Sequence, residues 1–207
     1  MPPTATPANS NIQKCWLKPE QVEAMRDAAH EGRHGTRDDA IVTTLYDTGL
    51  RRAELAQVNR DMLDLDDEQL RIPASIQKDY PNDNTPSAAT FALDPSGDLR
   101  TVRTLRIYLQ SRDDDSPALF PSRKSDRLTG KAINDVVKRL AERADIRPHS
   151  YAGRGDPSDV TAHTLRHSVA WRMLRDGRDN TLYDVRNRLR HATILTTERE
   201  YDHFETI

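Results

Sequence analysis

Apolar residues recur every three or four positions through most of the chain, which is the spacing of one buried helix face. Pro19 is well placed to begin the first helix, because the first helical turn does not need its missing N–H. The sequence Asp47-Thr48-Gly49 is a turn signal that ends the second helix. The pattern predicts one helix from Pro19 and others over about 38–46, 52–58, 99–109, 133–144, 164–174, 182–189 and 196–204.

One stretch has the two-residue alternation of a half-buried strand instead. Leu63 and Leu65 alternate, a turn follows at 66–68, and Leu70 and Ile72 alternate again. A third strand is expected near 90–93, and Pro73 either ends the second strand or makes it an edge strand. Residues 78–86 and 147–159 are expected to be loops. The fold class is therefore α+β, mainly α-helical with a small antiparallel β-sheet.

The length of 207 residues fits one substantial domain. Residues 1–17 show no period and are expected to form a flexible arm, with the domain over 18–207. Cys15 is the only cysteine, which excludes a disulfide framework. The sequence has no apolar run long enough to cross a membrane and no signal-peptide core near its start. We expect a soluble, cytoplasmic protein.

Charge type is more informative than net charge, which is −2. Arginine outnumbers lysine 25 to 6, and the planar guanidinium suits bidentate phosphate contacts. Residues 163–191 hold seven Arg and three Asp, a local charge of +4 that is typical of a nucleic-acid footprint. Aspartate outnumbers glutamate 24 to 9. That excess fits either a GC-rich genome or a salt-adapted surface of haloarchaeal type.

Three short motifs combine residues that could act on a phosphodiester. They are T-G-L-R-R-A-E-L at 48–55, H-T-L-R-H at 163–167, and L-R-H at 189–191, which is followed by Tyr201. Arginines from two segments can clamp one phosphate and stabilise the charge of its transition state. A neutral histidine can take the proton of an attacking hydroxyl, and a tyrosine needs such help to act as a nucleophile.

The order and spacing of these motifs resemble the catalytic domain of the tyrosine recombinase family, of the phage-integrase type. The resemblance covers about 19–204. It implies that Arg51 and Arg166 bind the phosphate, that His163 is the acid–base histidine, and that His191 hydrogen-bonds the phosphate. It further implies that Tyr201 is the nucleophile. Lys78 is the candidate general acid, since the family uses a lysine on the β-hairpin.

The resemblance implies site-specific DNA recombination through a 3′-phosphotyrosyl intermediate, with no metal, cofactor or ATP. The expected partners are double-stranded DNA and further copies of the chain, as a tetramer on DNA. The family's separate N-terminal core-binding domain is expected to be absent, and an accessory DNA-binding partner could supply it. Two local departures stand out. Arg190 occupies a position that is usually glycine, and Tyr201 follows His191 by ten residues, one more than usual.

Alternatives remain at this stage. The chain could be a catalytically weak or inactive DNA-binding regulator, or a stand-alone resolvase similar to type IB topoisomerases. Lys78 could be an ordinary solvated loop residue. Four histidines could instead form a metal site, although no carboxylate lies at ligand spacing beside them. Those histidines are His163, His167, His191 and His203.

Overall fold

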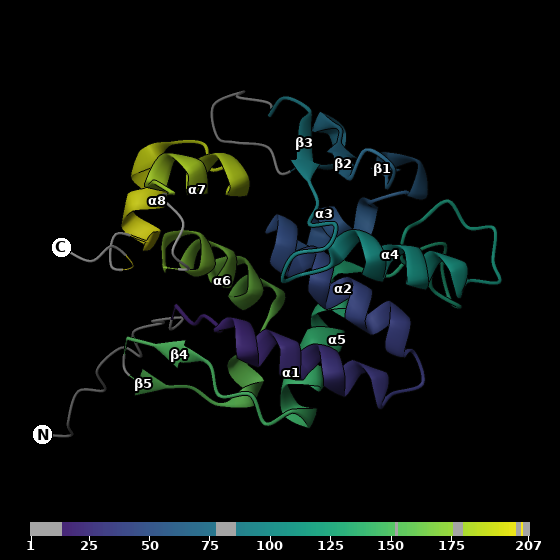
Figure 1. Ribbon diagram of the computed structural model, residues 1–207, viewed down its shortest axis with the longest axis horizontal. Coiled ribbons are helices and arrows are strands. Elements are labelled where there is room, and N and C mark those ends of the chain that lie inside the picture. Colours follow the sequence, from purple (N-terminus) through teal and green to yellow (C-terminus); the bar gives the residue numbers. More distant parts are fainter. Residues whose placement is uncertain (1–13, 78–85, 152, 176–179, 202–203, 205–207) are drawn as a thin grey trace, which may run out of the picture.

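The computed structural model describes residues 14–77, 86–151, 153–175, 180–201 and 204 (Figure 1). Helices make up most of this part, together with two small antiparallel sheets. The α-helices are α1 (Pro19–His30), α2 (Gly35–Thr48), α3 (Arg52–Gln57), α4 (Thr101–Gln110), α5 (Gly130–Arg143), α6 (Ala162–Arg175), α7 (Leu182–Leu189) and α8 (Ile194–Tyr201). The strands are β1 (Leu63–Asp64), β2 (Gln69–Ile72), β3 (Ala89–Ala92), β4 (His149–Ser150) and β5 (Gly153–Arg154).

Helix α2 is the centre of the domain. Every residue from Asp38 to Thr48 is buried, and the helix contacts α1, α4 and α6. A helix that is buried all round needs polar side chains to bond within the interior. Thr44 and Thr48 do so by donating to carbonyl oxygens one turn earlier, at 2.7 and 2.6 Å. The core therefore forms around the segment that leads directly into the first motif.

The three-stranded sheet has the order β1-β2-β3 with antiparallel pairing. Leu70 on β2 lies opposite Leu63 on β1 and Phe91 on β3. Strand β2 is the central strand and ends at Ile72, directly before Pro73, so the second of the two alternatives for Pro73, an edge strand, does not apply and the first is confirmed. The sheet itself and its antiparallel pairing are confirmed.

The predicted helices are present, with different limits at several ends. Helix α4 starts at Thr101, so Leu99 packs in the core from the preceding loop. Helix α8 runs from Ile194 to Tyr201 rather than over 196–204. The loop expected over 147–159 contains the short β4–β5 hairpin, whose two-residue strands are too short to show alternation.

The arm expected over 1–17 is described only from residue 14 onward. There the structure differs from the expectation, because residues 14–17 pack on the domain. Leu17 is fully buried and its N–H donates to Ser168 on α6 at 2.7 Å. Trp16 forms a backbone bridge with His149 and stacks on its ring, with centroids 5.9 Å apart. This segment therefore joins α6 to the β4–β5 hairpin.

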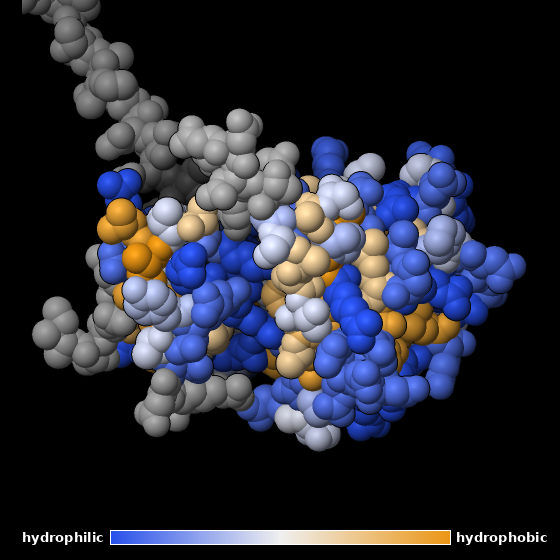
Figure 2. Space-filling model, turned by 90° about the horizontal axis from the view of Figure 1, so that it is seen from above, coloured by the Kyte–Doolittle hydropathy of each residue, from blue (hydrophilic) through white to orange (hydrophobic). Residues whose placement is uncertain are grey.

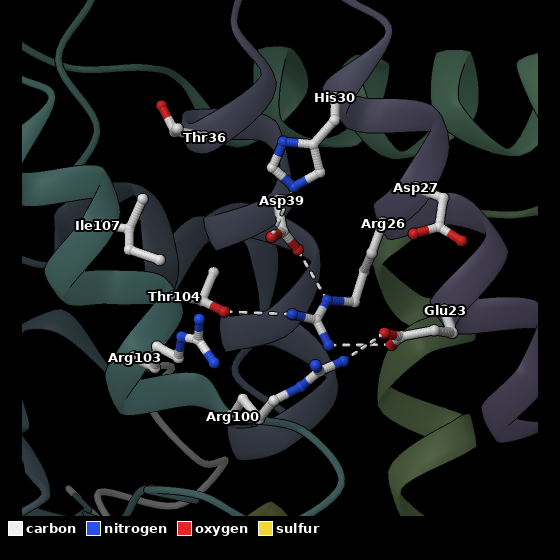
Figure 3. A pocket seen from close by; sticks show the side chains of 10 residues that line it. All are labelled: Glu23, Arg26, Asp27, His30, Thr36, Asp39, Arg100, Arg103, Thr104 and Ile107. Atoms are coloured by element: carbon white, nitrogen blue, oxygen red, sulfur yellow. Dashed lines mark hydrogen bonds and ion pairs between the residues drawn. The ribbon is translucent and has the colours of Figure 1, made fainter.

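A cavity of about 230 Å³ lies between α1, α2 and α4 (Figure 3). Arg26 reaches across it and donates to Asp39 at 2.7 Å, to Glu23 at 2.9 Å and to Thr104 at 3.1 Å. A buried guanidinium is stable only when its donors are satisfied in this way. The network holds three helices together on the side of the domain that carries none of the three motifs.

The face of the molecule drawn in Figure 2 is predominantly hydrophilic. Figure 2 shows one face on which apolar residues form separate groups among polar ones. Among the helices that the structure describes, none is long and apolar enough to cross a membrane.

Candidate active site

The first motif turns sharply between α2 and α3. Gly49 caps α2 in the left-handed conformation, with φ of 66°, and its N–H donates to Leu45. A Cβ at this position would overlap the side chain of Leu189 on α7. Glycine is therefore needed for both the backbone angle and the close approach of the third motif.

Arg51 is the N-cap residue of α3 and is held by Glu54, three positions later. The backbone N–H of Arg51 donates to Glu54 Oε2 at 2.8 Å, and its Nη1 donates to Oε1 at 3.0 Å. Glu54 is buried, whereas the Arg51 side chain keeps 27% of its surface exposed. Glu54 thus fixes one side of the guanidinium, while the exposed part stays accessible to a ligand, which is the arrangement that a phosphate-binding group requires.

Arg166 lies on α6 and is 2% exposed. Its guanidinium donates to the backbone oxygens of Gly49 and Leu189, so it joins the other two motifs directly. Burial, followed by the positive charge of Arg51, lowers the pKa of Arg166 to about 10. The side chain remains protonated at neutral pH, and a permanent charge is built into the interior at this point.

Aromatic rings from the second and third motifs surround Tyr201. The ring centroids of His163 and His167 are 4.3 Å apart, and those of His167 and Tyr201 are 5.3 Å apart. His191 stacks on Tyr201 at 5.8 Å and 12°, and its Nδ1 lies 3.0 Å from Thr197 Oγ1. The longer chain between His191 and Tyr201 therefore still leaves the two rings in contact.

The electrostatic setting keeps the histidines neutral. Burial, and then the charges of Arg166 and Arg51, lower the pKa of His191 to about 3. Loss of hydration and the charge of Arg166 also lower the pKa of His163. A neutral imidazole can accept a proton, which a base beside a tyrosine requires.

Tyr201 is 1% exposed, and burial raises the pKa of its hydroxyl. The charges of Arg166 and Arg51 oppose that rise, which places the tyrosine within the field of both arginines. Its hydroxyl is therefore protonated in the free protein and needs a base to become nucleophilic.

Five of the six predicted site residues lie in the described part of the chain, and the structure brings them into one cluster. They are Arg51, His163, Arg166, His191 and Tyr201. Lys78 falls outside the described residues, as does His203 of the alternative metal site. Among the residues that are described, no group of three His, Cys, Asp or Glu side chains could hold a metal ion.

Sequence reasoning missed three residues that support this cluster: Glu54, Gln77 and Arg190. The capping pattern of an acidic residue three positions after Arg51 could have revealed Glu54. Arg190 was singled out only as a departure from glycine. Gln77 carries no local signal, because its partner Arg190 is far away in the sequence.

Three solved structures share the arrangement of these elements. XerA recombinase matches with a TM-score of 0.69 and 23% identity over 93% of this chain and 66% of that chain. XerH site-specific recombinase bound to difH substrate, in a pre-cleavage complex, matches with a TM-score of 0.64 and 20% identity over 91% of this chain and 50% of that chain. The Tn1549 transposon integrase in complex with circular intermediate DNA matches with a TM-score of 0.68 and 16% identity over 91% of this chain and 62% of that chain. The fold is that of tyrosine recombinase and integrase catalytic domains.

The sequence comparisons agree with the fold. Residues 15–206 match the Phage integrase family, and the chain belongs to that family. Tyrosine recombinase XerC of Herpetosiphon aurantiacus is 35% identical over 169 residues, which are 81% of this chain and 48% of that protein. Tyrosine recombinase XerC of Shewanella amazonensis is 31% identical over 95% of this chain and 60% of that protein. The chain thus spans roughly half the length of these relatives. The resemblance inferred from the three motifs is confirmed.

Proposed function

We propose that this chain carries the catalytic domain of a site-specific recombinase or integrase that cuts and rejoins double-stranded DNA. The observation that supports the proposal best is the convergence of Arg51, Arg166, His191 and Tyr201 from segments far apart in the sequence. Two fixed positive charges, neutral imidazoles and one buried tyrosine hydroxyl form the set that metal-free phosphodiester displacement needs.

In the first step, Arg51 and Arg166 hold the scissile phosphate and His163 accepts the proton of the Tyr201 hydroxyl. The phenolate oxygen attacks phosphorus and forms a 3′-phosphotyrosyl bond as the bond to the 5′ oxygen breaks. Lys78 gives a proton to that leaving oxygen. The 5′ hydroxyl of a second strand then gives its proton to Lys78 and attacks the phosphotyrosine, and the Tyr201 oxygen leaves as His163 returns its proton. The bond energy stays in the phosphotyrosine, so the cycle needs no ATP.

Strand exchange between two duplexes requires several copies of the chain, and we propose a tetramer on DNA. This chain matches about half of the length of the XerC relatives, and we propose that a second DNA-binding unit outside the matched part, which an accessory partner could supply, takes part in the reaction. Such a unit would add contacts that position the half-sites and bend the DNA.

Covalent trapping tests the activity directly. The protein is incubated with nicked and supercoiled DNA in EDTA, across a range of KCl concentrations, and run on a denaturing gel beside Tyr201→Phe. We expect an adduct with the original protein and none with the variant. A native gel shift without any adduct would favour a DNA-binding regulator, and relaxation of supercoils without strand exchange would favour a topoisomerase-like resolvase.

The role of Lys78 is tested with a substrate whose leaving 5′ oxygen is replaced by sulfur. A thiolate leaves without protonation because a thiol pKa is about 8.5. Loss of a general acid costs about 10²–10⁴ in rate. Lys78→Ala should therefore lose that factor on the oxygen substrate and recover most of it on the sulfur substrate. Equal loss on both substrates would assign the lysine another role.

A further inference from the structure

Arg190 has an unusual backbone and an unusual environment for an arginine. It ends α7 in the left-handed conformation, with φ of 53° and ψ of 52°, where glycine is least strained. Its side chain is nevertheless only 10% exposed. A position that accepts both strain and the burial of a charge must gain from the contacts of its guanidinium.

The guanidinium binds two partners from different parts of the chain. Its Nη2 lies 2.6 Å from Glu54 Oε2, and its Nη1 donates to Gln77 Oε1 at 2.7 Å. The same group lies over the ring of Phe91 on β3, 5.2 Å from the centroid. Arg190 therefore contacts α3, β3 and the segment that follows β2. His191 is the next residue in the chain.

The contact with Glu54 acts on Arg51. Glu54 Oε2 accepts from both Arg190 and the Arg51 backbone N–H, while Oε1 accepts from the Arg51 guanidinium. Burial raises the pKa of Glu54, but the charges of Arg190 and Arg51 outweigh it and the net direction is downward. Arg190 thus keeps Glu54 ionised and oriented as the support of a phosphate-binding arginine.

The contact with Gln77 acts on the segment that joins β2 to Lys78. The Gln77 amide nitrogen donates to the carbonyl oxygen of Ile72 at 3.2 Å and to that of Ser87 at 2.8 Å. It therefore ties together the two described flanks of residues 78–86. Arg190 fixes the other end of the same amide, so the orientation of Gln77 is set from both sides.

We propose that Arg190 is a positioning residue, which fixes Arg51 through Glu54 and the flanks of the Lys78 segment through Gln77. This inference rests on the proposed strand-cleavage function, and it explains why an arginine replaces glycine before His191. Arg190 thus holds Glu54 of the first motif and Gln77, which follows β2, in place relative to His191 of the third motif. Misplacement of a catalytic group by about 1 Å can cost about a hundredfold in rate.

Arg190→Gly is the decisive variant, because glycine accepts the left-handed backbone without strain. We expect the rate of adduct formation at saturating DNA to fall about tenfold to a hundredfold, with DNA affinity within about threefold of the original protein. Arg190→Lys keeps the charge but cannot serve two partners in a fixed fork, so it should recover only part of the rate.

Arg188→Met provides a matched control. Arg188 lies on the same helix, also covers Phe91, and pairs with Asp47 at 2.6 Å instead of with Glu54. Its adduct rate should stay within about threefold of the original protein at temperatures where both are folded. An Arg190→Gly rate equal to that of the original protein, or an equal loss in the control, would overturn the inference.

A double-mutant cycle tests the route through Gln77. Gln77→Leu should slow the original protein more than it slows Arg190→Gly, because the link between Gln77 and Arg190 is already absent from that variant and only the bonds to Ile72 and Ser87 remain to be lost. Fully additive losses would overturn that route.

Amide hydrogen exchange separates failure of this inference from failure of the proposed function. Exchange over 50–55 and 72–77 should rise in Arg190→Gly and not in Arg188→Met, whether or not the protein forms an adduct. No adduct with the original protein would refute the proposed function alone. Unchanged exchange would refute the positioning role.

Discussion

Helices α6 and α8 carry the two kinds of group that the site needs, and they are built very differently. Helix α6 is buried without a break from Thr164 to Ala170 and packs against α2 and α5. Helix α8 buries only Thr197 and Tyr201 and packs mainly against α7. Figure 1 shows α7 and α8 at one end of the molecule, beside α6. Arg166 therefore lies on a helix of the core, whereas Tyr201, although itself buried, lies on a helix whose other residues are mostly exposed or half-buried.

This difference follows from what each group must do. A charge that stabilises a transition state works best when it is fixed before the reaction, which requires a rigid setting. A nucleophile that attacks one strand and is later released can lie on an element of lower local stability. The segment before α1 contacts α8 through Lys14 and reaches Tyr201 through Phe204, whose ring stacks on that of Tyr201. Trp16 contacts the ring of Phe204 at 5.0 Å, and Lys14 pairs with Glu200 at 3.3 Å.

The largest expected effect comes from removing the core charge. Arg166→Ala leaves the carbonyl oxygens of Gly49 and Leu189 without their buried donor. It also removes one of the two charges that we propose bind the phosphate. We expect the adduct rate to fall by about 10²–10³. Unfolding free energy should fall by about 2–4 kcal/mol, since each unsatisfied buried acceptor costs about 1–3 kcal/mol.

Tyr201→Phe is the contrasting variant for the same comparison. It keeps the ring contacts with His167 and His191, so urea unfolding should change by less than about 1 kcal/mol while the adduct disappears. If both variants lost the same stability, the distinction between Arg166 on the buried helix α6 and Tyr201 on the less buried helix α8 would fail.

Trp16→Ala should loosen α8 and leave α6 intact. The substitution removes ring contacts with Phe204 and Tyr151, the latter at 6.2 Å. Because Trp16 is only partly buried, we expect a loss of about 1–3 kcal/mol, below the usual cost of a fully buried aromatic. Hydrogen exchange should accelerate over α8 and stay unchanged over 164–170. Equal acceleration in both helices would contradict the comparison.

Acid should weaken the region where the two helices meet. Burial, followed by the charges of His163 and Arg166, holds the pKa of His167 well below its usual value. Between that value and about 6.5 the unfolded chain binds more protons than the folded one, so stability rises with pH in this window. One histidine of this kind should lower the free energy of unfolding by roughly 1–2 kcal/mol at pH 5 relative to neutral pH.

Urea unfolding at pH 5, 6 and 7 measures this slope. His167→Asn should flatten it, because the variant has one fewer group that is neutral when folded and charged when unfolded. A slope that is the same in both proteins would show that other groups account for the acid sensitivity.

The difference between α6 and α8 also determines how much of each helix could be predicted from the sequence. Helix α6 and its site residues follow from one local motif, because periodicity and an i, i+3 pair already place His163 and Arg166 near each other. The stacking of Tyr201 on His191 could not be predicted, since a helix turns by about 100° for each added residue. In the structure the left-handed Arg190 and residues 191–193 separate α7 from α8, and the two rings stack.

Contacts between distant segments were equally hidden. Nothing near Gln77 indicates a partner on α7, and nothing near Trp16 indicates Phe204. The compositional reasoning that makes residues 1–17 an arm cannot register that Leu17 fills a place in the core. Local patterns therefore predicted the elements and most of the cluster, while the supports of the cluster required tertiary packing.

The smallest expected effect comes from Lys14, whose contact with Glu200 on α8 is compared with the contact between Trp16 and Phe204. Lys14 and Glu200 are each about a third exposed, so their ion pair is screened by water and salt. Lys14→Met should change the unfolding free energy by less than about 1 kcal/mol, and the difference should shrink further as KCl is raised. Hydrogen exchange over α8 at low and high salt measures it, with Trp16→Ala as the reference. A Lys14 effect as large as that of Trp16, and independent of salt, would mean that charge rather than ring packing holds the tyrosine helix in place.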